Sequence, residues 1–217
     1  MCFAFFVSVQ VPSGYDPVQE LKNTCTDIEE AVKAGEIMSS GIVIDEYSEF
    51  IRRKWGDGGD WTKMDGLALD NRWFAGFAER TGLWLVLICH EQQPKFEKAV
   101  QRFGKDGKDS FKTKGECEEL GGPAIPFGKE RASFISQVSF SPRRVTQQTG
   151  EGINYYWITK PLNNFYCKMR GEELANKEIR PFGDLVRLNG MSFSAYRGVD
   201  KDGCLKLAEP DPYLKAA

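Results

Sequence analysis

The chain lacks the features by which composition alone identifies a membrane protein, a secreted protein or a strongly charged one. None of its apolar runs approaches the roughly 20 residues that cross a bilayer. Its start, MCFAFFVSVQVP, has neither the basic leader nor the small-residue cleavage site of a signal peptide. The net charge of −2 excludes a globally basic nucleic-acid binder and leaves room for a local basic patch. These absences predict a cytoplasmic protein that does not use a membrane.

Metal-binding residues are also scarce. The chain has one histidine and six cysteines, and no two cysteines form a C-x-x-C pair. Structural zinc sites draw their ligands from closely spaced Cys and His. We therefore expect reduced thiols and no structural zinc.

Apolar runs alternate with helical patterns in the first 90 residues. Strands are predicted at 2–11, 41–44 and 83–91, with helical patterns at 16–36, 46–55 and 65–82 between and beside them. Strands that are apolar throughout and alternate with helices are typical of a parallel sheet covered on both faces. The expected fold class is therefore α/β, a three-layer core with a mostly parallel central sheet.

The second half of the chain reads differently. Residues 93–130 are rich in turns and charges, and the segments 132–148, 153–161 and 163–171 are rich in strand-forming residues, partly antiparallel. We expect one core over residues 1–180 and a loosely packed tail over 181–217.

Two predicted strands end on polar side chains. Asp45 and Glu46 follow the apolar run GIVI, and His90 follows LWLVLIC. Ligands of parallel sheets bind at the carboxyl ends of the strands, so these three residues are the candidate catalytic group. Asp45 would hold Mg²⁺, Glu46 would orient an attacking water, and His90 would sense a phosphate. The alternative is a strand that surfaces at Asp45 and a histidine with ordinary hydrogen-bond partners.

A pair of cations follows later in the chain. Lys168 and Arg170 alternate on one face of a predicted strand in YCKMRG. Two long cations that project together suit a phosphate held on a neighbouring subunit. The alternative is a solvated strand edge, where lysine is common.

In this order, GIVIDEYSEF, WLVLICHE and YYWITKPLNNFYCKMRG resemble the RecA-like ATPase core, within the P-loop NTPase superfamily. The similarity covers roughly residues 1–172 and is greatest to phage-encoded ATP-binding proteins related to single-strand annealing recombinases. It implies ATP and Mg²⁺ as cofactors, with Asp45 as the Walker B acid and His90 as the sensor. Lys168 and Arg170 would act in trans in a homo-oligomer, in the host cytoplasm if the gene is of phage origin.

One part of the family pattern is missing. The family holds phosphates with G-x-x-x-x-G-K-[ST], and this chain has no such motif, because GGPAIPFGKE has the wrong spacing and continues into Glu130. The resemblance implies that the chain starts at the family's second strand. The expectation is therefore that it binds ATP weakly or not at all, either through truncation or through loss of nucleotide binding.

Two segments suit single-stranded DNA. Residues 52–66 carry Trp55 and Trp61 among cations and glycines, and residues 93–114 hold seven cations against three carboxylates, a local charge of +4. Aromatic rings stack on bases while cations neutralise the backbone. The alternative is a solvated loop with both tryptophans folded onto the core. The candidate DNA contacts are Trp55, Trp61, Lys95, Lys98 and Arg102.

Three functions remain open from the sequence. The first is an ATPase-type domain that supports DNA recombination or replication on single-stranded DNA. The second is a non-catalytic DNA-binding or assembly subunit. The third is a nuclease-like α/β domain, which needs a third convergent acid that the sequence does not indicate.

Overall fold

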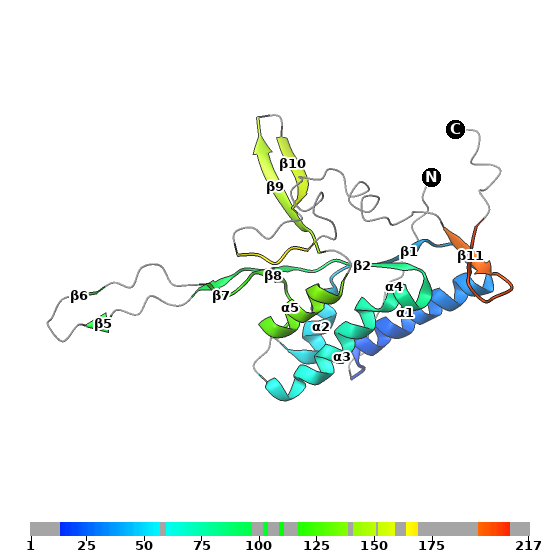
Figure 1. Ribbon diagram of the computed structural model, residues 1–217, viewed down its shortest axis with the longest axis horizontal. Coiled ribbons are helices and arrows are strands. Elements are labelled where there is room, and N and C mark those ends of the chain that lie inside the picture. The colour runs from blue at the N-terminus through cyan, green and yellow to red at the C-terminus, as the bar shows by residue number, and fades with distance from the viewer. Residues whose placement is uncertain are drawn as a thin grey trace. The chain divides into compact units, whose positions relative to one another are not determined.

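The structure is a computed structural model that describes residues 14–56, 60–96, 102–103, 109–110, 117–138, 141–150, 152–158, 164–168 and 195–208 (Figure 1). The chain divides into two compact units, the first comprising Met1–Cys89 with Gly190–Ala217 and the second His90–Asn189. The strand predicted at 2–11 lies outside the described residues, as does the expected boundary near residue 180.

The first unit is mainly helical. Its elements are α1 (Pro17–Ala34), β1 (Gly41–Ile44), α2 (Tyr47–Trp55), the 3-10 turn η1 (Trp61–Lys63), α3 (Met64–Ala75), α4 (Phe77–Thr81), β2 (Trp84–Leu87), β11 (Tyr196–Val199) and β12 (Leu205–Leu207).

Helix α1 confirms the helix predicted at 16–36, and its ends show why the sequence specifies it. Asp16 caps the start, its carboxylate accepting hydrogen bonds from the backbone N–H groups of Val18 (2.9 Å) and Gln19 (3.1 Å). Pro17 occupies the first turn, where its missing N–H costs nothing. Gly35 ends the helix in the left-handed conformation at φ 77°.

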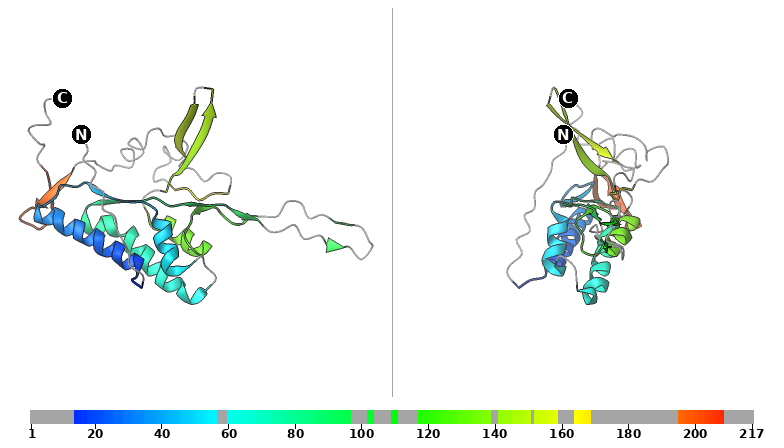
Figure 2. Two further views of the ribbon diagram at one scale, coloured as in Figure 1. Left: turned by 180° about the vertical axis from the view of Figure 1, so that it is seen from behind. Right: turned by 90° about the vertical axis from the view of Figure 1, so that its left-hand side faces the viewer.

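Strands β1 and β2 are parallel neighbours, with Ile44 opposite Leu87. Helices α1, α2, α3 and α4 lie on one side of this pair (Figure 2). Ile42 and Ile44 face inward and are buried, whereas Val43 points the other way and is 54% exposed. The alternation follows from the period of two along a strand.

The predicted fold class is wrong. The described residues form six two-stranded sheets, of which β1–β2 is parallel and the other five are antiparallel. The predictions at 41–44 and 83–91 contain the strands β1 and β2, but apolar residues on both faces of a strand do not require that both faces be covered. Val43, and Ile88 at 47% exposed, show that the described part of this sheet is covered on one face. A three-layer RecA-like core with a central parallel sheet is therefore not what the described chain forms.

A buried carboxylate joins the helices of the first unit. Asp70 on α3 contacts the ammonium groups of Lys22 on α1 (2.6 Å) and Lys54 on α2 (3.0 Å). The indole N–H of Trp55 donates a third hydrogen bond to it, at 2.8 Å. Since a buried charge is costly unless paired and hydrogen-bonded, these contacts fix the three helices together.

Within its described residues, the second unit consists of short strands, one helix and one long hairpin. Its elements are β3 (Glu91–Gln92), β4 (Lys95–Phe96), β5 (Arg102–Phe103), β6 (Asp109–Ser110), β7 (Cys117–Glu119), β8 (Gly122–Pro123), α5 (Gly128–Gln137), β9 (Arg143–Thr149) and β10 (Gly152–Ile158). The strand-rich sequence predicted at 132–148 is wrong up to Gln137, where the chain is helical, and is confirmed at Arg143–Thr149. The segment predicted at 153–161 is confirmed within Gly152–Ile158. The described part of 163–171, residues 164–168, has isolated bridges at Phe165 and Lys168 and no strand.

Arg131 organises this unit from inside α5. Its side chain is fully buried and donates to the carbonyl oxygens of Leu120 (2.9 Å) and Ile125 (3.1 Å) and to the side chain of Gln92. It also forms an ion pair of 2.9 Å with Glu119. One arginine therefore connects α5 with β3, β7 and the loop after β8.

Candidate functional site

The predicted acidic pair lies in a turn that is anchored by its neighbour. Asp45 and Glu46 are both exposed, and a carboxylate oxygen of Asp45 accepts a hydrogen bond of 2.9 Å from the Glu46 N–H. Glu46 has the left-handed conformation (φ 56°) and starts α2. Tyr47 then fixes the turn, because it is fully buried and its hydroxyl donates to Asn71 at 3.0 Å. The two carboxylates are held at the carboxyl end of β1, as predicted, and face solvent.

His90 is exposed and begins the second unit, where its carbonyl accepts a hydrogen bond of 2.8 Å from Ala124. Among the described residues, no group of three or more His, Cys, Asp or Glu side chains is placed to hold a metal ion. The roles of Asp45 with Mg²⁺ and of His90 with a phosphate stay predictions.

Of the predicted cation pair, the structure describes Lys168 alone. The ammonium of Lys168 donates to the carbonyl oxygens of Val138 (2.7 Å) and Ser136. These carbonyls belong to the C-terminal end of α5, where cations stabilise the helix dipole. This geometry gives Lys168 a structural role within its own unit. Arg170 lies outside the described residues.

The predicted DNA contacts separate into different surroundings. The indole of Trp55 lies against α3, where an added Cβ at Gly66 would come within 2.2 Å of the ring, so this side chain is packed inward. Trp61 is 62% exposed on η1. Lys95 pairs with Glu119 at 2.9 Å. Arg102 begins β5, and Lys98 lies outside the described residues.

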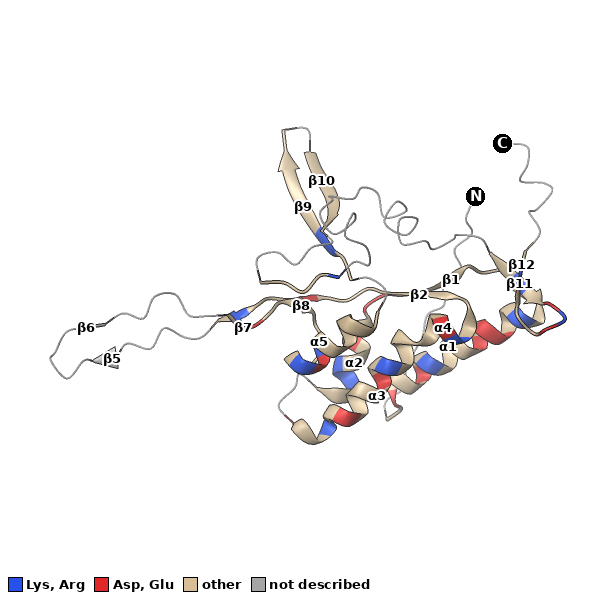
Figure 3. Cartoon of the chain, in the orientation of Figure 1, with Lys and Arg blue, Asp and Glu red and all other residues tan. Residues whose placement is uncertain are grey.

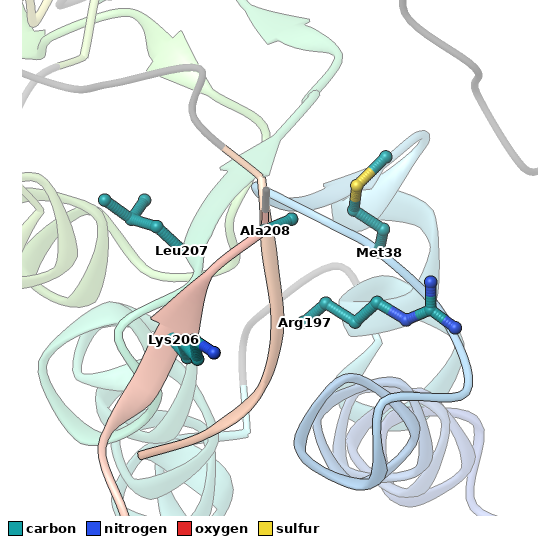
Figure 4. Close-up of a pocket in the computed structure, with 5 residues that line it drawn as sticks. All are labelled: Met38, Arg197, Lys206, Leu207 and Ala208. Atoms are coloured by element: carbon teal, nitrogen blue, oxygen red, sulfur yellow. The ribbon is translucent and has the colours of Figure 1, made fainter. Parts of the chain in front are cut away.

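A shallow depression exists in the first unit beside the β11–β12 hairpin (Figure 4). Its volume is about 250 Å³, and it is lined by Met38, Arg197, Lys206, Leu207 and Ala208. Arg197 is held there by a hydrogen bond of 2.8 Å from its Nε to the carbonyl of Gly35. The volume falls below the roughly 300–1,000 Å³ of most small-molecule sites, and we assign no ligand to the depression.

Another exposed surface is the β9–β10 ribbon, formed by Arg143–Thr149 and Gly152–Ile158 (Figure 2). All seven residue pairs are in register, and directly opposite residues share a face. One face, called here the Tyr155 face, carries three pairs: Arg144 with Trp157, Thr146 with Tyr155, and Gln148 with Ile153.

The Tyr155 face is the solvent side of the ribbon. All its residues are exposed except Trp157, which is half-buried. Tyr155 is 54% exposed, and the guanidinium of Arg144 lies 5.2 Å from the centre of its ring. This is the geometry of a cation–π contact.

The other face attaches the ribbon to its unit. Arg143 forms a two-pronged ion pair with Glu91, one contact of which is 3.1 Å. Its guanidinium also lies 3.7 Å from the centre of the Phe165 ring. The two adjacent arginines therefore differ in their surroundings. Arg143 contacts Glu91 and Phe165, whereas Arg144 lies on the exposed face.

The charged side chains on the two strands of the ribbon are all positive. The two strands hold two arginines and no carboxylate, and Figure 3 shows no acidic residue on either arrow. The helices of the first unit, in contrast, carry both signs interspersed. Cationic and amide side chains beside exposed aromatic rings are the residues that proteins use to bind nucleic acid.

The sequence predicts strands here but indicates no function for them. The compositional signal for DNA binding is stronger at 52–66 and 93–114, which contain tryptophans, lysines and glycines. The signal for the ribbon was the alternation itself: Arg144, Thr146 and Gln148 recur at every second position, as do Ile153, Tyr155 and Trp157.

No helix within the described ranges has the length and apolar character needed to span a membrane. Comparisons with protein-family models, with curated proteins and with solved structures found no match.

Proposed function

We propose that this protein is a non-catalytic subunit that binds single-stranded DNA through the Tyr155 face of the β9–β10 ribbon. The observation that carries the proposal is the pairing of the exposed Tyr155 ring with Arg144 on a ribbon whose strands hold no carboxylate. Of the functions left open by the sequence, this is the binding subunit.

The physical reason is that the two halves of a nucleotide need different partners. A base offers an apolar π face, and stacking it on an aromatic side chain is worth about 1–3 kcal/mol. The phosphate needs a cation, which Arg144 supplies beside the ring. Thr146 and Gln148 add hydrogen-bonding groups on the same face.

The test is fluorescence anisotropy with a labelled oligothymidylate and the full chain. Tyr155→Ala is expected to weaken binding about 5- to 150-fold, which is the stacking range expressed as a ratio. Arg144→Ala is expected to weaken binding and to lower the slope of log K against log salt by about 0.7, the value for one contact to a single strand.

Two control variants make the result specific. Tyr15→Ala removes another exposed tyrosine (63% exposed, against 54% for Tyr155) from the first unit and is expected to leave affinity unchanged. Trp61→Ala tests the loop predicted from sequence. Binding that survives Tyr155→Ala and is lost in Trp61→Ala would overturn the ribbon proposal in favour of the loop, and no binding at low salt would overturn both.

A further inference from the structure

The Tyr155 face has a repeat that can be compared with the repeat of DNA. Its three cross-strand pairs, Arg144 with Trp157, Thr146 with Tyr155, and Gln148 with Ile153, form three rows across the ribbon. Each row places one aromatic or apolar side chain opposite one cationic or hydrogen-bonding side chain. Successive rows are two residues apart, or about 6.8 Å along the strands.

This spacing decides which form of nucleic acid fits. Stacked bases in B-DNA repeat every 3.4 Å or so along each strand, half the distance between rows. Bases that remain stacked on each other therefore cannot each lie against a different row. A strand whose bases are separated can do so, because each base then exposes a face to one ring and its phosphate or edge to the polar residue opposite.

We infer that the ribbon binds one unstacked nucleotide per row, so that its site covers about three nucleotides and rejects duplex DNA. The inference rests on the proposed function and adds to it the length and the conformation of the ligand. Tyr155 lies in the central row, and Trp157 lies in the row farthest from the turn that joins the two strands. The third row, at Ile153, lacks a ring, although this side chain is 59% exposed and on the same face.

The missing ring allows a test by gain of affinity, which misfolding cannot imitate. Ile153→Phe places a third aromatic side chain in the row that lacks one. Binding of a six-nucleotide oligothymidylate is expected to tighten by about fivefold, the low end of the stacking range. The residue is exposed, so the substitution requires no repacking of the unit.

The length of the site is measured with oligothymidylates of 2, 3, 6, 12 and 24 nucleotides at about 0.15 M salt, where long-range attraction is screened. Affinity is expected to rise steeply up to 3 nucleotides. Beyond 6 nucleotides, affinity is expected to grow no faster than the number of positions at which a three-nucleotide site can lie on the oligonucleotide. That number rises about fivefold between 6 and 24 nucleotides. A fully paired duplex of 12 base pairs is expected to bind at least about tenfold more weakly than the single strand of 12 nucleotides.

The two proposals fail in different ways. The three-nucleotide site would be overturned if Tyr155-dependent affinity rose with oligonucleotide length far more than the number of available positions does. It would also be overturned if that affinity were equal for duplex and single strand. Either result would leave DNA binding by the ribbon intact. The same holds if Ile153→Phe fails to tighten Tyr155-dependent binding. Loss of all Tyr155 dependence would overturn the proposed function itself.

Discussion

A single buried arginine connects several elements of the second unit. Arg131 has no exposed surface and serves two backbone carbonyls as well as Glu119 and Gln92. Replacing it with methionine keeps most of the volume but removes every donor. Arg131→Met is therefore expected to lower the free energy of unfolding by about 3–5 kcal/mol, the range for breaking a buried ion pair. Urea denaturation followed by tryptophan fluorescence measures it.

The matched control is the other cation on Glu119. Lys95 is bound to the same carboxylate at 2.9 Å, but its side chain is 60% exposed. Lys95→Ala is expected to cost less than about 1 kcal/mol, because water replaces most of what an exposed pair provides. Equal losses for the two variants would contradict the assignment of Arg131 as the interior organiser of this unit.

At the scale of the element, one face of the ribbon is attached to the second unit and the other is exposed to solvent. Arg143 is held by Glu91 and by the Phe165 ring, whereas Arg144 faces solvent beside Tyr155. Arg143→Ala is expected to lower stability by about 1 kcal/mol, the sum of a partly exposed ion pair and a cation–π contact. Arg144→Ala is expected to lower stability by no more than about 0.5 kcal/mol, because this arginine has the exposed cation–π contact with Tyr155 but no ion pair with Glu91. Thermal denaturation of the two variants, side by side, measures the difference.

These neighbouring arginines are controls for each other, since they have the same chemistry and adjacent positions on β9. Stability that falls equally in both variants would mean that Arg144 is also part of the attachment. The assignment of the Tyr155 face as the free face of the ribbon would then be wrong.

At the scale of the molecule, Asp16 in the first unit and Glu119 in the second are carboxylates whose ionisation is linked to folding. Burial raises the pKa of Glu119, but Lys95 and Arg131 outweigh it and hold the pKa below its usual 4.5. Burial also raises the pKa of Asp16, but Lys54 and the N–H groups at the start of α1 outweigh it and hold the pKa below 3.8. Both groups therefore add stability that is complete above the unfolded pKa and is lost as the pH falls through the folded one.

The two variants Glu119→Gln and Asp16→Asn are expected to act in different pH windows. Urea midpoints measured from pH 7 to pH 2.5 should fall for the wild type below about pH 4.5. Glu119→Gln should remove the part of the fall that starts near 4.5, and Asp16→Asn the part that starts near 3.8. A wild-type profile that either variant reproduces without change would show that its carboxylate is not linked to folding.

Local structure followed from the sequence wherever neighbouring residues decide it. Asp16, Pro17 and Gly35 set the bounds of α1 because capping and left-handed backbone are properties of a few adjacent residues. The strand at 41–44 and its polar end at Asp45 and Glu46 were visible for the same reason. The strands of the ribbon could be read from Arg143 onward, because alternation has a period of two.

Tertiary structure decided what those elements do. The sequence could not show that Trp55 turns inward, because its partners Asp70 and Gly66 are brought to it by the packing of α3 on α2. Nor could it show that Lys168 caps the C-terminal end of α5, 30 and 32 residues away in the chain. Cover on the second face of β1–β2 was inferred from apolar residues, yet whether a face is covered depends on elements distant in sequence. The same holds for the ribbon: alternation fixes which residues share a face, and only the contacts of Arg143 with Glu91 and Phe165 determine which of the two faces is left to solvent.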